Sequence, residues 1–267
     1  MCIHLSNKIF FLEKHRFIVK MNLMYKLYQI VFTLYSWVLF VSIWMLSTLI
    51  AIVVSLDTKK KENAFNTLER VSSRIAFKLL GIQVKIQGIE NIPKNEPLIF
   101  ISNHQSMIDI KLSLAFIPTN FSFISKDTIF RIPILGSFMT VSGHIPIQRT
   151  DDRKAYETLL TAIKKLSSKK SIVIFPEGTR SEDGKLAPFK RGISLIILKS
   201  GKRVMPMAIC GSSQLMPKRG WLSHPEKRHI KISFGKPLSF DNSRTDREYT
   251  IHVTNTLQAE VSRLLHA

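Results

Sequence analysis

The chain has 267 residues, 45% of them hydrophobic and 22% charged, which excludes an intrinsically disordered or collagen-like protein. Its 39 lysine and arginine residues outnumber its 19 aspartate and glutamate residues, and the formal net charge of +20 predicts an anionic partner such as a membrane surface, a phosphorylated substrate or nucleic acid. Cys2 and Cys210 are the only cysteines, which excludes a disulfide framework and a thiolate zinc cluster.

The first feature along the chain is an apolar run over residues 27–56 that contains no charged side chain. As one helix this run would be about 45 Å long at ~1.5 Å per residue, against a bilayer hydrocarbon core of ~30 Å, so it would have to tilt or lie partly in the interface. A buried core helix is the alternative, but core helices seldom stay uncharged over such a length. The run therefore predicts membrane association.

Basic residues flank this run on both sides, with Lys20 and Lys26 before it and Lys59, Lys60 and Lys61 after it. A simple span would export one of the two groups, whereas an interfacial helix keeps both on the cytoplasmic face. We therefore favour a monotopic anchor over a single span, with the rest of the chain on the cytoplasmic face of the membrane. Residues 1–61 are predicted to form this basic, membrane-anchoring helical segment, and residues 62–267 a separate domain.

From residue 62 onward, short apolar runs alternate with helical patterns. Strands are expected over residues 82–87, 98–102, 121–125, 144–148, 171–175, 204–210 and 229–234, and helices over residues 62–80, 106–116, 152–167, 192–199 and 246–265. This alternation predicts an α/β domain with a mostly parallel central sheet flanked by helices.

The polar sequence Asn103-His104-Gln105-Ser106 follows the second expected strand, and Asp109 lies five residues after His104. Functional sites in α/β sheets gather at the carboxyl ends of the strands. If His104 lies in the loop and Asp109 in the first turn of the next helix, the carboxylate can accept from one ring nitrogen and leave the other to take a proton. The alternative is a loop histidine, with Asp109 placed to interact with the helix dipole.

A second polar turn, Glu177-Gly178-Thr179-Arg180, follows the expected strand at residues 171–175. Gly178 lets the backbone approach a ligand, Thr179 offers a hydroxyl and Arg180 offers a forked cation, and together these suit a phosphate monoester. Glu177 is expected to orient Arg180 or a substrate hydroxyl. The alternative is a surface turn with a solvated arginine.

Two further cations, Lys126 and Arg149, follow expected strands and are additional candidate phosphate ligands, unless they are merely solvated. The 8 histidines lack metal-ligand spacing, so no metal site is expected. Nucleic acid is not expected as a partner, because aromatic residues are not interleaved with the basic ones.

In this order, the motifs resemble those of the glycerolipid acyltransferases, and among them the 1-acyl-sn-glycerol-3-phosphate acyltransferases most closely. The resemblance rests on residues 103–106 with Asp109, on residues 143–149, on residues 175–181 and on residues 204–209. It covers roughly residues 82–237, and an N-terminal membrane segment is also typical of the family. Gln148, Met205 and Met207 depart from the residues common in the family, which leaves the acyl-chain preference open.

The resemblance implies transfer of a fatty acyl group from acyl-CoA or acyl carrier protein to the sn-2 hydroxyl of 1-acyl-sn-glycerol 3-phosphate, giving phosphatidate. His104 would be the general base with Asp109 as its partner, and Arg180, Arg149 and Lys126 would hold the phosphate. The expected partners are membrane lipids, lysophosphatidate and the acyl donor, with no cofactor. The alternatives are acylation of another lysolipid or of glycerol 3-phosphate, and a non-catalytic, membrane-tethered binder of anionic lipid.

Overall fold

The computed structural model describes residues 2–54, 61–148, 154, 156–158, 160–161, 170–220 and 222–267. Its helices are α1 (Cys2–Val54), α2 (Lys61–Leu79), α3 (Ile108–Phe116), α4 (Leu135–Val141), α6 (Gly192–Ser200), α7 (Ser212–Leu215) and α8 (Arg247–His266), with 3-10 turns η1 (Ile89–Asn91) and η2 (Asp127–Arg131). Its strands are β1 (Gln83–Gln87), β2 (Ile99–Ser102), β3 (Phe121–Lys126), β4 (Ile145–Ile147), β5 (Ser171–Ile174), β6 (Val204–Cys210) and β7 (His229–Phe234).

The strands form one sheet in the order β1-β7-β6-β2-β5-β3-β4. Neighbouring strands are parallel except β6 and β7, which pair antiparallel. The predicted α/β fold with a mostly parallel sheet is therefore confirmed, and each expected strand ends within one residue of its observed bounds. Most of the helix expected over residues 152–167 lies outside the described residues.

Burial explains why the central strands could be predicted from the sequence. Every residue of β2 and β5 is buried, because helices cover both faces of the sheet, and such strands read as continuous apolar runs. The edge strand β1 instead alternates between exposed and half-buried residues. Helix α4 was not expected, because its seven residues are too few to show a helical period.

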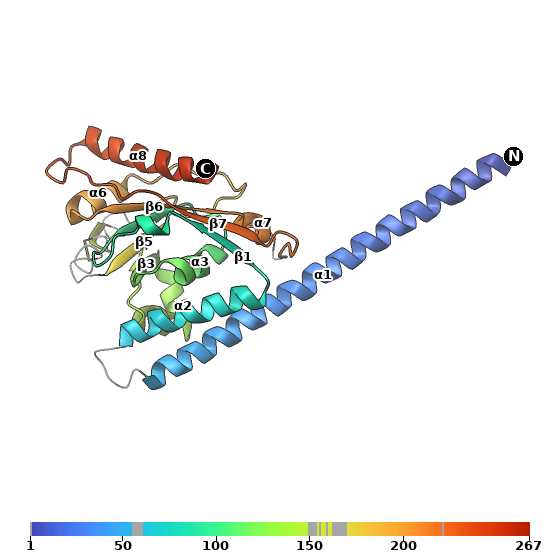
Figure 1. Cartoon of the computed structure of the whole chain (residues 1–267), viewed down its shortest axis with the longest axis horizontal. Coiled ribbons are helices and arrows are strands. Elements are labelled where there is room, and N and C mark those ends of the chain that lie inside the picture. The colour runs from blue at the N-terminus through green and yellow to red at the C-terminus, as the bar shows by residue number, and fades with distance from the viewer. Residues whose placement is uncertain are drawn as a thin grey trace.

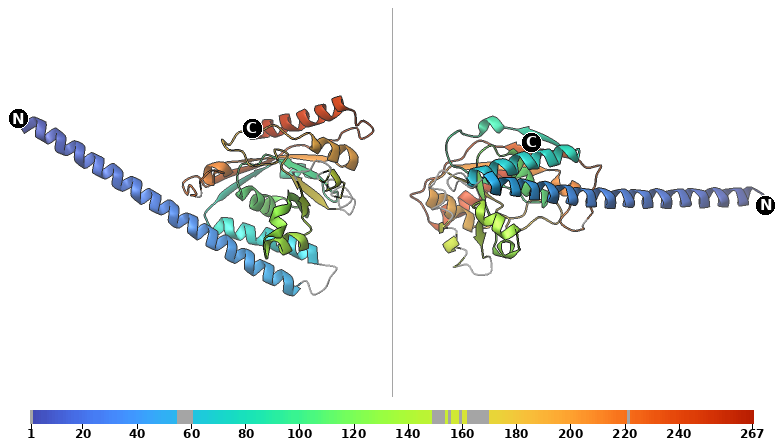
Figure 2. Two further views of the ribbon diagram at one scale, coloured as in Figure 1. Left: turned by 180° about the vertical axis from the view of Figure 1, so that it is seen from behind. Right: turned by 90° about the horizontal axis from the view of Figure 1, so that it is seen from below.

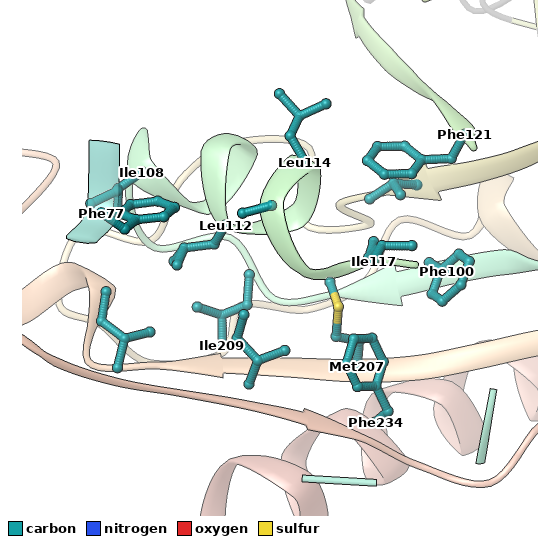
Figure 3. Packing of buried hydrophobic residues seen from close by; sticks show 14 of the residues in the cluster. Phe77, Phe100, Ile108, Leu112, Leu114, Ile117, Phe121, Met207, Ile209 and Phe234 are labelled. Carbon is teal, nitrogen blue, oxygen red and sulfur yellow. The ribbon is translucent and has the colours of Figure 1, made fainter. Parts of the chain in front are cut away.

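The helices form a layer on each face of the sheet. Helices α6 and α8 cover one face, and α3, α2 and part of α1 lie on the other (Figure 1). On the α3 side, Leu112 and Ile117 of the helix and loop pack against Phe100 of β2 and Met207 of β6, all 1% exposed or less (Figure 3). This packing fixes α3 against the end of β2, which positions the loop between them.

Helix α1 is a rod whose first part projects beyond the domain, while its last part lies alongside α2 (Figures 1 and 2). Phe32 is 8% exposed and belongs to the main core, and Trp44 meets Phe138 edge-on at 5.4 Å. The hydroxyl of Thr33 accepts a hydrogen bond from the Ser223 main-chain N–H at 2.9 Å. Part of the predicted anchoring segment is thus packed into the α/β domain.

Helix α1 buries polar residues against the domain and exposes apolar ones, the reverse of a helix on the surface of a soluble protein. The polar residues Gln29, Thr33, Ser36 and Ser47 are buried against the domain. The outward face is apolar and at least 40% exposed at Val31, Leu34, Val38, Val41, Met45, Leu49 and Ile50. Within the described residues, Ile18–Ile50 is long and apolar enough to cross a membrane by length and composition. A continuous apolar surface of this kind marks a membrane or protein contact.

Charged side chains of α2 hold α3 in place. Lys111 Nζ of α3 lies 2.8 Å from Glu69 Oε2 of α2, and the Glu69 side chain is only 4% exposed. Near the other end of α3, Arg74 Nε donates to the Ala115 carbonyl at 2.7 Å, which satisfies one of the carbonyls that a helix end leaves open. The ion pair and the cap fix α3 at two points along its length.

We expect Lys111→Met to destabilise the fold by about 3–5 kcal/mol, because it leaves the buried Glu69 carboxylate without its cation. Urea unfolding of the detergent-solubilised protein measures this change. A Glu69→Gln/Lys111→Met double variant should recover much of the loss. As a control, Arg131→Met removes a cation from the pair with Asp127 on the surface, where Arg131 is 75% exposed. A similar loss in both single variants would contradict a special role for the buried pair.

Candidate active site

The predicted site residues gather because their strands run parallel. Strands β3, β5 and β2 are neighbours with the same direction, so their carboxyl ends meet at one edge of the sheet. His104 follows β2, Gly178 and Arg180 follow β5, and Lys126 ends β3. All four line one cavity of about 700 Å³. This edge is where ligands bind in open α/β sheets.

His104 and Asp109 form a hydrogen-bonded pair. His104 lies in the loop after β2 and Asp109 in the first turn of α3, and His104 Nδ1 is 3.0 Å from Asp109 Oδ2. The same oxygen accepts main-chain N–H groups from Gln105 at 2.7 Å and Ser106 at 2.8 Å. The Asp109 side chain is fully buried, so its orientation is set by these three donors.

These contacts determine the tautomer of the His104 ring. An ionised carboxylate only accepts hydrogen bonds, so the proton of the neutral ring must sit on Nδ1, facing Asp109. The other nitrogen, Nε2, then carries a free lone pair, and no described residue hydrogen-bonds to it. The ring stacks on Phe175 with centroids 4.2 Å apart and planes 18° apart, which fixes its plane. The His104 side chain is 15% exposed and lies on the cavity wall, so a substrate can reach it.

Glu177 joins the two polar motifs. Its Oε1 accepts the His104 main-chain N–H at 2.6 Å, and its Oε2 accepts the Ala187 main-chain N–H at 2.9 Å. In the other direction, the Ser181 N–H donates to the His104 carbonyl at 2.8 Å. Burial raises the pKa of the Glu177 carboxyl, and the hydrogen bonds from Ala187 and His104 oppose this rise.

The structure therefore gives Glu177 different partners from those we expected. We expected it to orient Arg180 or a substrate hydroxyl, but both carboxylate oxygens are occupied by main-chain N–H groups, and the side chain is buried rather than facing the cavity. The physical reason is that a buried carboxylate needs several donors, and the folded loops supply main-chain donors closer than any side chain.

The turn after Glu177 leaves the Arg180 side chain free. Gly178 has φ +74°, a conformation that favours glycine. Lys218 Nζ donates to the Arg180 carbonyl at 2.7 Å and lies 3.4 Å from the hydroxyl of the exposed Thr179. Because the turn is held through its main chain, the Arg180 guanidinium lines the cavity, and it forms no ion pair with any described residue.

Of the two remaining cations that the sequence predicted, the structure describes one. Lys126 lies on the cavity wall and is exposed, so the structure brings it together with Arg180. Arg149 lies outside the described residues.

The sequence did not predict the roles of three further residues, of which Asn103 and Ser106 belong to the first polar motif. Asn103 pairs with the main chain of Ile209 in β6, accepting at 2.8 Å and donating at 2.9 Å, which ties the loop to the neighbouring strand. The buried Ser106 hydroxyl donates to the Met216 carbonyl at 2.7 Å, so it supports the loop and does not face the cavity. Lys190 also lines the cavity, although it lies outside the motifs and was not predicted as a site residue. Each of these contacts joins segments that are distant in the sequence.

Comparison with known proteins shows which proteins the chain resembles. Residues 83–210 match the family model described as Acyltransferase. A chloroplastic 1-acyl-sn-glycerol-3-phosphate acyltransferase of Brassica napus is 40% identical over 156 residues, which cover 57% of this chain and 44% of the relative. A 1-acyl-sn-glycerol-3-phosphate acyltransferase of Chlamydomonas reinhardtii is 34% identical over 199 residues, which cover 73% of this chain and 58% of the relative. The chain spans about half the length of these curated relatives.

A solved structure extends the likeness to nearly the whole fold. The crystal structure of the 1-acyl-sn-glycerophosphate (LPA) acyltransferase PlsC from Thermotoga maritima matches with a TM-score of 0.76 and 27% sequence identity, covering 90% of this chain and 97% of that chain. Fold and site together define an α/β protein with a histidine–aspartate pair and cations on one cavity wall. Residues 83–210 are a domain of the acyltransferase family, which confirms the resemblance of the motifs.

We expect Glu177→Gln to destabilise the protein by about 1–3 kcal/mol, because the amide replaces one acceptor oxygen with a donor. Either the His104 N–H or the Ala187 N–H then faces another N–H group. Urea unfolding measures the loss, and the NMR resonances of the His104 ring report its displacement. The matched control is Glu182→Gln, an exposed carboxylate of the same loop. An unchanged unfolding free energy with an unmoved His104 resonance would contradict the role assigned to Glu177.

Proposed function

We propose that this protein transfers a fatty acyl group from a thioester to the sn-2 hydroxyl of 1-acyl-sn-glycerol 3-phosphate, giving phosphatidate. The observation that carries the proposal is the His104–Asp109 pair, which lies in the same cavity as the unpaired Arg180. Acylation of a phosphorylated alcohol needs a general base for the hydroxyl and a group that binds the phosphate. The printed names of the relatives, 1-acyl-sn-glycerol-3-phosphate acyltransferases, support the same reaction.

His104 supplies the base. A hydroxyl is a weak nucleophile at neutral pH, and the free Nε2 lone pair accepts its proton as the oxygen attacks the thioester carbonyl. The positive charge that forms on the ring is stabilised by the Asp109 carboxylate, 3.0 Å from Nδ1. When the tetrahedral intermediate collapses, the C–S bond breaks and the imidazolium returns the proton to the departing thiolate. The acceptor hydroxyl attacks directly, so no acyl-enzyme forms.

Arg180 and Lys126 hold the phosphate of the acceptor, with Arg149 as a further candidate ligand. A guanidinium binds phosphate oxygens in pairs, so Arg180 fixes the orientation of the headgroup as well as its position. Gly178 lets the main chain approach the phosphate, and Thr179 offers a hydroxyl beside it. A fixed phosphate holds the sn-2 hydroxyl near His104, which lowers the entropic cost of the reaction.

The rest of the cavity wall suits an acyl chain. Its apolar lining comprises Ile110, Phe123, Ile124, Ile129, Ile147, Ile174, Ile193, Leu195 and Ile196. Acyl-CoA and acyl carrier protein present the same thioester to His104, and the proposal includes both as donors. Membrane lipids are partners because the acceptor and the product are both lipids.

The protein is proposed to lie on the cytoplasmic face of a membrane as a monotopic enzyme. The buried face of α1 between Gln29 and Ser47 packs on the domain, so this stretch cannot cross the bilayer without leaving its contacts. Its outward face instead lies along the interface, together with the exposed Val71, Ile75 and Leu79 of α2. This arrangement keeps both basic flanks on one side of the membrane.

The purified protein in lipid vesicles should release free thiol from acyl-CoA only when 1-acyl-sn-glycerol 3-phosphate is present. His104→Ala should lower turnover by about 10²–10⁴-fold, because it removes the proton acceptor. Asp109→Asn should also be severe, because a neutral amide stabilises the imidazolium poorly. His229→Ala, at an exposed histidine that starts β7, is the control. Absence of thiol release from the wild type with either donor, or near-normal turnover of His104→Ala, would refute the proposal.

Replacing Leu34, Val38 and Val41 together by glutamine should weaken binding to neutral vesicles by about 100-fold or more. Each of these exposed side chains contributes on the order of 1.5 kcal/mol when it is buried in an apolar environment. Vesicle sedimentation measures the partition coefficient. Glutamine at the exposed His252 and Asn255 of α8 serves as the control and should leave binding unchanged. Equal sedimentation of the α1 variant and the wild type would place the membrane contact elsewhere.

A further inference from the structure

We propose that Lys190 binds a phosphate group inside the cavity that contains His104 and Arg180. The inference rests on the proposed function and adds a residue that none of the motifs includes. Lys190 lies two residues before α6, and its side chain lines the cavity.

The main chain around Lys190 is fixed to the turn after β5. The Lys190 N–H donates to the Pro176 carbonyl at 2.9 Å, and the Ala187 N–H donates to Glu177 at 2.9 Å. Between them, Phe189 is 6% exposed, and its N–H donates to Gln258 of α8 at 3.1 Å. The backbone that carries Lys190 is therefore built into the site, although the side chain itself is exposed.

The side chain of Lys190 lies over Gly178. A Cβ atom added to Gly178 would be 2.8 Å from Lys190 Cε and 3.1 Å from Lys190 Nζ. The ammonium group thus lies against the backbone of the turn at Gly178, two residues before Arg180. The positive φ of Gly178 favours glycine, and a larger residue there would also displace the end of the Lys190 side chain.

No described side chain neutralises Lys190. Among the residues that the structure describes, those lining the cavity include the cations Lys126, Arg180 and Lys190 and no aspartate or glutamate. Asp183, the acid nearest to Lys190 in the sequence, accepts the Ser181 hydroxyl and the Lys185 N–H. Glu177 is bound by two main-chain N–H groups. An ammonium group in a cationic cavity is electrostatically unfavourable until an anion binds.

The charge of the substrates indicates what this anion is. A phosphate monoester carries about −1.5 to −2 at pH 7, which Arg180 and Lys126 can offset between them. Lys190 adds a third charge, which acts as a point charge and needs no fixed fork geometry. Its ligand is a phosphate group, which either the headgroup of the acceptor or the phosphates of the acyl donor can supply.

The test compares Lys190→Met, which keeps the length of the side chain and removes its charge, with Lys190→Arg, which keeps the charge. Loss of a charged hydrogen bond should lower kcat/KM by about 10–150-fold for the phosphate-bearing substrate in Lys190→Met. Lys190→Arg should recover most of it. Arg191→Met is the matched control, because Arg191 is the adjacent exposed cation and does not line the cavity.

Two pairs of substrates identify the source of the phosphate. If Lys190 binds the acceptor, the loss should disappear with monoacylglycerol and persist with an acyl-N-acetylcysteamine donor, which has no phosphate. If it binds the donor, the loss should persist with monoacylglycerol and disappear with acyl-N-acetylcysteamine. Either result supports a phosphate ligand. Equal losses with all combinations would mean that Lys190 acts through the turn and would overturn the proposal.

Binding measurements separate this proposal from the proposed reaction. Calorimetry with glycerol 3-phosphate and with CoA gives two dissociation constants without any turnover, and Lys190→Met should raise one of them about 10-fold or more while Arg191→Met raises neither. If the wild type binds a probe in this way but releases no thiol, the reaction is wrong and the phosphate ligand stands. If the wild type is active and Lys190→Met changes neither kinetics nor binding, the phosphate-binding role of Lys190 is refuted and the proposed function stands.

Discussion

The hydrogen bond from the His104 main chain to the buried Glu177 carboxylate is the contact on which the rest of the site depends. It joins loops that leave two adjacent strands, and the Ser181 N–H closes the connection from the other side by binding the His104 carbonyl. Both main-chain groups of His104 are held by these bonds, and its ring is oriented by the hydrogen bond to Asp109 and the stacking on Phe175. A buried carboxylate suits this task, because each of its oxygens satisfies a main-chain N–H that would otherwise be unpaired inside the protein.

Contacts of α1 and α2 extend the support of the site to the helices with exposed apolar faces. Helix α3 carries Asp109 at its start, and α2 holds it through the Glu69–Lys111 pair and through Arg74 at the last turn. Helix α1 packs on α2 and places Phe32 in the core. The helices with exposed apolar faces are therefore packed directly on the helix that carries Asp109. In the proposed function, an anchor built this way fixes the height and tilt of the cavity relative to the membrane surface, as a lipid substrate requires.

The sequence was most informative where one physical requirement decided the structure. Strands β2 and β5 are buried on both faces, so an apolar run alone predicted them, and the direction of parallel strands was enough to bring His104, Arg180 and Lys126 together. The partners of Glu177 could not be predicted, because they are main-chain groups of loops up to 73 residues away, and every residue type except proline presents the same N–H. Lys190 and Lys218 were missed for a related reason: their roles depend on which turn they lie over.

The site also separates its charges by depth. The two acids, Asp109 and Glu177, are 0% and 4% exposed and bind main-chain N–H groups, so their charges are offset within the protein. The cations that line the cavity, Lys126, Arg180 and Lys190, form no ion pair with any described residue and face the space where a substrate binds. In the proposed reaction, an incoming anionic lipid meets positive charge at the wall, while the negative charge that supports the base lies behind the histidine ring. With the acids on the wall instead, repulsion of the phosphate would oppose the binding on which His104 depends.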